Sequence, residues 1–460
     1  MSFGRWVVAV VSVLLAVTAV PASAAAPAPT ALTLTAPGGY ADASTSLTVV
    51  LTHSGGSPLA GVQVVVERRV AGVWQPAGTV ATDAAGAAPL GQVLRRVAGD
   101  NVWRATYAGD ATYAPASSPQ VVAPLTRRRG LATLRVPRRV VDERAVTARV
   151  RWQTTTGVPV VGTVRLQRRT PGRGWRAAGS FTTRADGRVS IRLRPRVDTR
   201  YRVRVPSLDW VSGDVSGVQR VDNVPPRRPV RLPKGAPSPR VKLPAQARAV
   251  GSGANLRVSA IPDGIWDQMT GVSWHPGCPV GRGGLRLVRV NYWGYDGYRH
   301  RGEVVTATGA SGQIGGALAE MYRRGFPIRS MYRIDRFGWS GRLQGGNDYQ
   351  SMAAGNTSAF NCRQVVNRPG VRSPHSYGRS LDVNTWENPY RSATGLVPNT
   401  WWQSRSHPLV AWRSGNHPVV RLMRAHGLRW TYGNGDTQHF DAARHGRVVL
   451  PRACVTEVCH

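Results

Sequence analysis

An internal repeat limits most strongly what the first half of this chain can form. The stretch GVQVVVERR that begins at Gly61 returns as GTVRLQRR from Gly162. In both copies the same landmarks follow, namely a tryptophan, an Ala-Gly pair and a further glycine: Trp74, Ala77-Gly78 and Gly86, then Trp175, Ala178-Gly179 and Gly187. The copies lie roughly one hundred residues apart, which is the size of one β-sandwich domain. The repeat therefore predicts two consecutive domains of one kind.

Hydrophobic alternation indicates that both copies are all-β. Between about residue 30 and residue 224, apolar and polar residues alternate with a period of two, which is typical of half-buried antiparallel strands. The clearest runs are Leu47, Val49 and Leu51; Val62, Val64 and Val66; Val189, Ile191 and Leu193; and Tyr201, Val203 and Val205. Gly, Asp and Pro separate the runs, as expected for turns.

The two copies resemble bacterial immunoglobulin-like modules of extracellular proteins. The resemblance predicts one immunoglobulin-like sandwich over residues 25–125 and a second over residues 126–224. Because a fold does not determine a function, these modules are expected either to bind a ligand or only to act as spacers.

The chain changes character after the second module. Residues 225–250 are rich in Pro, Arg and Lys, which predicts an extended, semi-rigid linker. Residues 251–460 are the first part with helical spacing, and they predict an α+β domain. Ser311 is expected to cap one helix, which ends at Gly325, and a second helix is expected to end at Gly427. Their apolar faces comprise Ile314, Leu318 and Met321, and then Val419, Val420 and Met423. The alternation of Ile328, Ser330, Tyr332 and Ile334 predicts a strand.

The first residues predict export. Arg5 precedes an apolar run from Trp6 to Val20 and the small-residue site Ala22-Ser23-Ala24, which is typical of a signal peptide over residues 1–24. No later stretch approaches the length that spans a membrane, so no stable membrane insertion is expected after cleavage. We expect a secreted protein, extracellular or associated with the cell wall.

Four cysteines in an exported chain favour disulfides over thiolate chemistry. Cys454 and Cys459 are close enough in sequence to form a small loop, which leaves Cys278 and Cys362 as a second possible pair. Four cysteines allow three connectivities, and all three stay open at this point.

The formal net charge of +37 comes almost entirely from arginine, since Lys234 and Lys242 are the only lysines. Such a charge attracts polyanions. Outside a cell these are wall polymers and anionic lipids, so the charge predicts loose retention by anionic wall polymers. No nucleic-acid partner is expected.

Two short stretches carry residues suited to metal chemistry: SPHSYGRSLDVN from Ser373 and GDTQHF from Gly435. Together they hold two imidazoles and two carboxylates. A zinc hydrolase needs three protein ligands and one open position, with a separate carboxylate to move protons. Asp436 and His439 are three positions apart, so they can share a site while only one contacts the metal. His375 and Asp382 flank Gly378, which suits a turn that leads into a strand.

Several blocks resemble the zinc D-alanyl-D-alanine carboxypeptidase (VanY-like) family. They are the segment from Ser373 to Tyr390, the segment SMAAGNTSAFNCR from Ser351 to Arg363, Gly277-Cys278-Pro279, the YWGYDG stretch from Tyr292 with His300 and Gly302, and Phe326-Pro327-Ile328-Arg329. All but the first resemble one secreted branch. The resemblance covers roughly residues 265 to 445.

The resemblance implies a zinc peptidase that acts on peptidoglycan stem peptides, either as a D,D-carboxypeptidase or as an L-alanyl-D-glutamate endopeptidase. It implies that His375, Asp382 and His439 bind Zn²⁺ and that Asp436 is the catalytic carboxylate. It also implies that Arg363 binds a substrate carboxylate or polarises the scissile carbonyl.

Three positions depart from the family pattern. Thr385 replaces a usual proline, Gly355 replaces a usual Asn or Asp, and the loop from Tyr432 to Asp436 is short. The short loop adjoins the catalytic carboxylate, so it bears on substrate preference more than on metal binding. The alternative is a non-enzymatic wall-binding or adhesive protein with a degenerate peptidase domain, since tandem modules and strong basic charge suit such a role.

Overall fold

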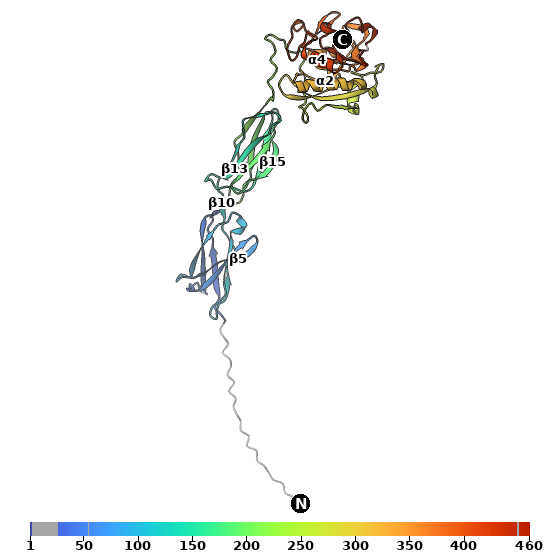
Figure 1. The fold of residues 1–460 in the computed structure, drawn as a ribbon. Helices are drawn as coiled ribbons and strands as arrows, with labels where there is room; N and C mark the ends of the chain where they lie inside the picture. The colour runs from blue at the N-terminus through green and yellow to red at the C-terminus, as the bar shows by residue number, and fades with distance from the viewer. Residues whose placement is uncertain (2–25, 54, 449) are drawn as a thin grey trace. The chain divides into compact units, whose positions relative to one another are not determined.

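The computed structural model describes residue 1 and residues 26–53, 55–448 and 450–460. Apart from residue 1, the predicted signal peptide lies outside the described residues. The chain is multidomain and divides into two compact units, Met1–Arg138 with Ala145–Asp222, and Arg139–Arg144 with Asn223–His460 (Figure 1). Among the described residues, no helix is long and apolar enough to cross a membrane.

The first repeat forms two antiparallel sheets around one core. One sheet has the order β1-β3-β6 and the other the order β5-β4-β7-β8, with β9 also on β7. The strands are β1 (Thr30–Thr35), β3 (Ser44–His53), β4 (Gln63–Val70), β5 (Val73–Ala81), β6 (Ala87–Val93), β7 (Val102–Tyr107), β8 (Ala116–Ser117) and β9 (Val121–Val122). The short strands β2 (Gly39–Tyr40) and β10 (Leu125–Thr126) pair in parallel. Apolar residues of both sheets, including Leu47, Val64 and the fully buried Trp103, form the core.

The second repeat has the same plan. One sheet has the order β11-β13-β16, and the other has the order β12-β19-β17-β14-β15, with β18 on β17. The strands are β11 (Gly130–Arg135), β12 (Arg139–Val141), β13 (Val146–Thr154), β14 (Thr163–Arg169), β15 (Arg176–Thr182), β16 (Arg188–Leu193), β17 (Thr199–Val205), β18 (Asp214–Val215) and β19 (Gln219–Val224). The four alternating runs fall on β3, β4, β16 and β17, which confirms the prediction of strands there.

The structure explains why each repeat copy has a glycine at its last landmark position, Gly86 or Gly187. Gly86 and Gly187 both have φ +72°, in the left-handed region that favours glycine. A Cβ at Gly86 would lie 2.6 Å from the carbonyl oxygen of Leu51, and a Cβ at Gly187 would lie 2.3 Å from that of Trp152. Both copies therefore need glycine at this close approach to the adjacent strand.

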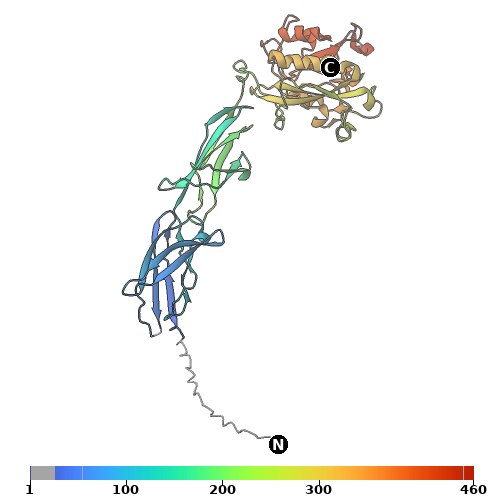
Figure 2. The same ribbon diagram turned by 60° about the horizontal axis from the view of Figure 1, so that its bottom comes forward.

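The second unit mixes helices and strands (Figures 1 and 2). Its largest sheet has the order β20-β21-β22, formed by Arg257–Ser259, Leu285–Trp293 and Arg299–Ala307. Helix α2 (Ser311–Arg324) packs on β21, and α4 (Pro418–Ala425) packs on α2. The sheet β27-β31-β30, formed by Ser380–Asp382, His439–Ala442 and Leu428–Arg429, carries two of the predicted site residues, Asp382 and His439. The remaining elements are α1 (Asp263–Met269), α3 (Asp348–Ala353), β23 (Trp339–Ser340), β24 (Gly345–Gly346), β25 (Gln364–Val365), β26 (Arg368–Arg372), β28 (Tyr390–Ser392) and β29 (Gly395–Val397).

Both predicted helices are present, but one detail of the first differs. Gly325, with φ +77°, ends α2 as expected. Ser311 is the first helical residue and does not cap the helix, because its hydroxyl donates to the carbonyl of Thr308 at 2.8 Å.

The predicted strand over residues 328–334 is wrong. These residues run without a strand, and Ile334 begins the 3-10 turn Ile334–Phe337. The side chains of two buried asparagines replace the partner strand: Arg329 N–H donates to Asn384 at 3.0 Å and Tyr332 N–H donates to Asn356 at 2.8 Å. Alternation of apolar residues could not distinguish this arrangement from a strand.

Residues 225–250, which the structure describes in full, contain neither helix nor strand. They nevertheless lie along the second unit. The indole N–H of Trp386 donates to the carbonyl of Pro237 at 2.7 Å, and Gln246 donates to that of Arg301 at 2.9 Å. The extended segment therefore packs on the α+β domain.

Candidate metal centre

Two local structures bring the three predicted ligands together. His375 lies in the 3-10 turn Pro374–Tyr377, where the Ser373 hydroxyl accepts from His375 N–H at 3.3 Å. Gly378, with φ +65°, reverses the chain into β27, which ends at Asp382. Strand β31 pairs antiparallel with β27 so that His439 lies directly opposite Asp382.

The facing atoms of these residues form a compact triangle. His375 Nε2 lies 3.1 Å from His439 Nδ1 and 3.1 Å from Asp382 Oδ2, and His439 Nδ1 lies 3.1 Å from Asp382 Oδ1. Ligand atoms at the usual zinc distances of about 2.0–2.1 Å lie about 3.3 Å apart in a tetrahedron. The spacing therefore fits a small tetrahedral cation.

The hydrogen bonds on the outer side of the two imidazoles determine whether their inner nitrogens carry a proton or a lone pair. His375 Nδ1 lies 2.6 Å from the carbonyl of Ala359, and His439 Nε2 lies 3.0 Å from Asp441 Oδ1. A neutral imidazole has one N–H, and these acceptors require it on the outer side. When both rings are neutral, as they are on binding a metal, the inner nitrogens present lone pairs toward Asp382, and the centre of the triangle is lined by acceptors alone. This donor set fits Zn²⁺, which binds neutral imidazoles and carboxylates.

Asp441 supports His439 from outside the triangle. Its carboxylate accepts from Ser380 Oγ at 2.6 Å and from Thr431 Oγ1 at 2.7 Å. Such carboxylate–histidine pairs fix the tautomer and the orientation of metal-binding imidazoles. Alternation along β31 placed Asp441 on the same face as His439, so an H-x-D pattern was the available sequence signal for this residue.

Asp436, the predicted catalytic carboxylate, is also buried next to the cluster. Its Oδ2 lies 3.1 Å from His460 Nδ1, while its Oδ1 is buried without a hydrogen-bond partner among the described residues. A buried acceptor without a partner is costly. This free oxygen is available to a water molecule or to substrate.

Arg363 adjoins the cluster through Asp348 and His460. Its Nη2 contacts Asp348 Oδ2 at 2.6 Å, its Nη1 donates to the main-chain oxygen of His460 at 2.8 Å, and its Nε is buried without a partner among the described residues. The structure thus brings together all five residues predicted from the sequence: His375, Asp382, Asp436, His439 and Arg363.

Sequence reasoning missed His460. This residue is fully buried, and its Nε2 lies 3.0 Å from Asp348 Oδ2 and 3.6 Å from Asp382 Oδ2. Inner atoms of His375, Asp382, His439 and His460 all lie within 4.8 Å of one another. Its neighbour Cys459 pairs with Cys454 in a disulfide loop, but no local pattern marks His460 as a site residue.

Burial and charge shift the protonation of the cluster strongly. Burial alone would raise the pKa of Asp382, but the neighbouring His375 and His460 hold it well below its ordinary value. Burial would lower the pKa of His439, but the carboxylates of Asp441 and Asp382 raise it well above its ordinary value. For His460, Asp382 and Asp436 outweigh burial and raise the pKa to about 9. Strong mutual perturbation of this kind is typical of functional sites.

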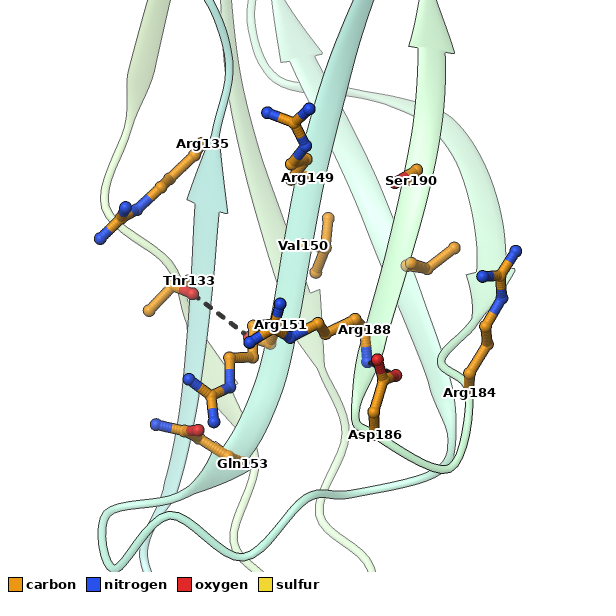
Figure 3. Close-up of a pocket in the computed structure, with 11 residues that line it drawn as sticks. Thr133, Arg135, Arg149, Val150, Arg151, Gln153, Arg184, Asp186, Arg188 and Ser190 are labelled. Atoms are coloured by element: carbon orange, nitrogen blue, oxygen red, sulfur yellow. Dashed lines mark hydrogen bonds between the residues drawn. The ribbon is translucent and has the colours of Figure 1, made fainter.

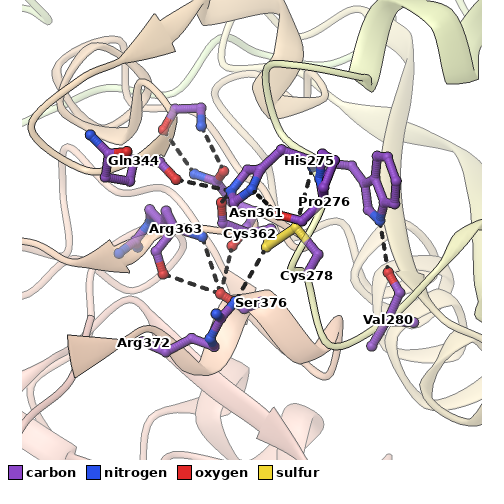
Figure 4. Close-up of a disulfide and its surroundings, with 12 residues drawn as sticks. His275, Pro276, Cys278, Val280, Gln344, Asn361, Cys362, Arg363, Arg372 and Ser376 are labelled. Carbon is purple, nitrogen blue, oxygen red and sulfur yellow. Dashed lines mark hydrogen bonds between the residues drawn. A yellow bond between two sulfur atoms is a disulfide. The ribbon is translucent and has the colours of Figure 1, made fainter. Parts of the chain in front are cut away.

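A second group of potential ligands does not form a metal site. His275, Cys278 and Cys362 lie close together, but the two sulfurs form a disulfide with Cα atoms 5.9 Å apart (Figure 4). The thiolates that bind metal are therefore not available. His275 Nε2 instead lies 3.0 Å from the carbonyl of Gln344 and 3.1 Å from that of Cys362. This disulfide anchors the chain immediately before Arg363.

A family profile matches the segment that carries most of the cluster. The profile of a family described as D-alanyl-D-alanine carboxypeptidase matches residues 367–442. The match includes four of the predicted residues, His375, Asp382, Asp436 and His439, and it also includes Asp441. Arg363 and His460 lie outside it. No curated protein matches the chain.

Solved structures give only distant likenesses. A tetra-tandem repeat from the extending region of a large adhesion protein is 14% identical, covers 60% of this chain and 74% of its own, and has a TM-score of 0.29. The sulfur carrier protein SoxY from Chlorobium limicola f thiosulfatophilum is 19% identical over 21% of this chain and 80% of its own, with a TM-score of 0.16. E. coli alpha-2-macroglobulin is 10% identical over 58% of this chain and 18% of its own, with a TM-score of 0.19. The sequence match is therefore the informative one: the segment that carries the buried His/Asp cluster is similar to the D-alanyl-D-alanine carboxypeptidase family of hydrolases.

Proposed function

We propose that the second unit is a zinc-dependent peptidase that hydrolyses peptide bonds in the stem peptides of peptidoglycan. The observation that carries the proposal is the acceptor-lined triangle of His375, Asp382 and His439, with inner atoms 3.1 Å apart. The family match over residues 367–442 supports the class of substrate. Neither observation depends on the other.

The residues of the triangle would hold the metal through His375 Nε2, His439 Nδ1 and one or both oxygens of Asp382. Bound Zn²⁺ supplies a Lewis acid that polarises a carbonyl and makes water acidic enough to attack near neutral pH. Asp436 Oδ1, which has no hydrogen-bond partner in the described part of the chain, would accept the proton of the attacking water and pass it to the leaving amine. Asp436 suits both proton transfers because its carboxylate is not one of the proposed metal ligands and stays free to take up and release a proton.

Arg363 provides the positive charge that the reaction needs near the scissile bond. A rigid, buried guanidinium either binds the terminal carboxylate of a stem peptide or stabilises the oxyanion that forms on the carbonyl. Asp348 holds one end of this guanidinium at 2.6 Å. We therefore propose Asp348 as the residue that positions Arg363.

Product analysis tests the proposal and separates its two forms. A D,D-carboxypeptidase releases D-alanine from pentapeptide stems, whereas an L-alanyl-D-glutamate endopeptidase separates the stem from its sugar chain at the first peptide bond. Mass spectrometry of digested muropeptides distinguishes these products. Failure to release either product, with the metal bound and the site open, would contradict the proposal.

We further propose that the protein acts outside the cell and is retained near the wall by its positive charge. Two disulfides, Cys278–Cys362 and Cys454–Cys459, suit an oxidising compartment. The net charge of +37 suits anionic wall polymers as partners.

A further inference from the structure

His460 contacts three of the residues that the proposed reaction uses. Its Nε2 lies 3.0 Å from Asp348 and 3.6 Å from Asp382, its Nδ1 lies 3.1 Å from Asp436, and its main-chain oxygen accepts from Arg363 at 2.8 Å. The same oxygen also accepts from the N–H of Val366 at 2.9 Å. One residue thus engages one proposed metal ligand, the proposed proton acceptor and the guanidinium at once.

The site is closed as a result. His375, Asp382, Asp436, His439 and His460 are each no more than 2% exposed. A catalytic zinc site keeps one position open for water or substrate, whereas a site with four protein ligands is typical of structural zinc. With His460 the site has four potential protein ligands, as a closed structural site does. It also has the carboxylate of Asp436 and the guanidinium of Arg363, which a catalytic site needs.

Three features hold the segment 454–460 over the site. The disulfide Cys454–Cys459 closes a short loop immediately before His460. Val458 packs against the cluster of Leu343, Met352, Val366 and Tyr390. Glu457 pairs with Arg368 at the surface. Among the described residues after Ala442 there is no α-helix or β-strand, so the segment can leave without breaking a sheet.

We propose that His460 closes the metal site from within the chain, so that this form of the enzyme is latent. It occupies Asp436 and Arg363, and its Nε2, which loses its proton when the metal binds, supplies a fourth ligand atom. The inference rests on the proposed function, since it requires a metal at the triangle. Opening requires displacement of segment 454–460 by competition from the substrate.

X-ray absorption of the zinc-loaded full chain tests this directly, because it counts imidazole ligands. We expect three imidazoles per zinc in the wild type and two in the His460→Ala variant. The variant should also bind zinc about tenfold more weakly in chelator competition, bind azide at its cobalt-substituted site, and cleave stem peptides faster than the wild type. The Cys454→Ser/Cys459→Ser variant should shift in the same direction, and the exposed His445→Ala variant should match the wild type.

These measurements distinguish failure of the closure by His460 from failure of the proposed peptidase function. Two imidazoles in the wild type, with equal zinc and azide affinities in His460→Ala, would overturn the closure by His460 while leaving a zinc peptidase intact. Slower cleavage by a zinc-loaded His460→Ala variant would also overturn closure and make His460 part of the reaction. Absence of zinc and of cleavage in both proteins would instead contradict the proposed function.

The sheet β11-β13-β16 of the second module has a strongly cationic surface. A groove of about 550 Å³ on this sheet is lined by five arginines, Arg135, Arg149, Arg151, Arg184 and Arg188, with Asp186 the one acidic residue in its lining (Figure 3). All five are exposed. Arg135 lies directly opposite Arg149, and Arg151 directly opposite Arg188. Like charges at facing positions destabilise a sheet.

The first module shows that this charge is not required by the fold. The strand pairing of β1, β3 and β6 has the same register as that of β11, β13 and β16. At the positions that correspond to Arg135, Arg149, Arg151 and Arg188, it has Thr35, Thr48, Val50 and Ala87. Only the second module has the cationic face.

We infer that this arginine face binds a linear polymer that carries one anionic phosphate in each repeat. Facing strands lie about 4.8 Å apart and successive outward residues about 6.8 Å apart, so the guanidinium groups form a two-dimensional array rather than a pocket for one anion. Guanidinium groups bind phosphate through paired hydrogen bonds. A chain of phosphates can engage several of them together, whereas a single phosphate cannot.

Binding of inorganic polyphosphate to the full chain tests this assignment. We expect the Arg149→Thr/Arg151→Val/Arg188→Ala variant, which carries the residues of the first module, to bind at least tenfold more weakly. The control Arg165→Ser/Arg168→Ser/Arg176→Ser removes the same charge from the other sheet and should weaken binding less than twofold. Equal losses in the two variants, or equal affinity for monophosphate, would overturn the assignment.

Discussion

The orientation of two imidazole rings determines whether the His/Asp cluster can hold a cation. Each ring uses its outer nitrogen as a donor, His375 toward Ala359 and His439 toward Asp441. Asp441 is itself held by two hydroxyl groups. In the proposed metal site, affinity would therefore depend on a carboxylate that does not face the cation.

Replacement of Asp441 by alanine should lower zinc affinity about 10–100-fold, the usual effect of removing such a support. The cause is loss of the acceptor that keeps His439 Nε2 protonated and its Nδ1 turned toward Asp382. Chelator competition on the full chain measures the change. Asp263→Ala, at an exposed position, serves as the control, and an unchanged affinity in Asp441→Ala would contradict the role of Asp441.

The sequence predicted the site residues that lie inside short motifs, but not His460. His375, Asp382, Asp436 and His439 are each close in sequence to another member of the site. The position of His460 depends on how segment 454–460 packs against residues that lie far from it along the chain, such as Leu343 and Tyr390. No local pattern contains that information.

The turn between His375 and Asp382 is the element that sets the geometry of the metal centre. Gly378 has φ +65°, and a Cβ there would lie 2.6 Å from the backbone nitrogen of Ala307 on β22. The backbone carbonyl of Gly378 also accepts from that nitrogen at 2.7 Å. The turn is therefore fixed both by its own conformation and by the neighbouring strand.

We expect Gly378→Ala to destabilise the second unit by about 2–4 kcal/mol, since the left-handed conformation and the backbone clash both oppose a side chain. Gly370→Ala is the matched control. Gly370 has φ +81° but no atom within 4 Å of an added Cβ, so only the conformational cost of about 1–2 kcal/mol applies. Denaturant unfolding of both variants measures the difference, and equal losses would show that the contact with β22 is unimportant.

Helix α4 begins with an unusual cap. His417 Nδ1 accepts from the N–H of Val419 at 3.2 Å, and its Nε2 lies 3.2 Å from the carbonyl of His407. Both contacts require the neutral ring with its proton on Nε2. Burial accordingly lowers the pKa of His417 below its ordinary value.

This cap should make the second unit less stable in mild acid. Because the pKa of His417 is lower in the folded state, its contribution is fully present above the unfolded pKa of about 6.5 and is lost as the pH falls below that value. His417→Asn retains a capping oxygen without titrating. We expect its melting temperature to fall less than that of the wild type between pH 7.5 and pH 5, and an equal fall would contradict the prediction.

Periodicity predicted elements well where one face of a strand or helix meets a core. The alternating runs on β3, β4, β16 and β17 and the apolar faces of α2 and α4 are of this kind. It failed at residues 328–334, where the backbone pairs with asparagine side chains instead of a strand. It also gave no indication that residues 225–250 lie along the second unit.

The whole chain combines a buried hydrolase-like site with a large positive charge. The charge is distributed over both units, while the arginine face lies on the second module alone. Attraction to an anionic wall would raise the local concentration of stem peptides around the attached peptidase. Salt screens such attraction but has little effect on a buried site.

Raising the sodium chloride concentration from about 0.05 M to about 0.5 M shortens the screening length severalfold. We therefore expect cleavage of intact walls to slow markedly, while cleavage of a soluble muropeptide changes little. Release of stem-peptide products from both substrates, measured at the two salt concentrations, gives the comparison. An equal effect on both substrates would contradict a role for wall retention.

Zinc content and muropeptide cleavage, measured together on the full chain, test the central claim most directly. The wild type and His460→Ala should each bind one zinc per chain, and His460→Ala should cleave. Adding His439→Ala should remove the metal and the cleavage, whereas adding Asp436→Ala should retain the metal and lose only the cleavage. If none of these proteins binds zinc or cleaves, the buried His/Asp cluster is not a metal centre and the peptidase proposal is wrong.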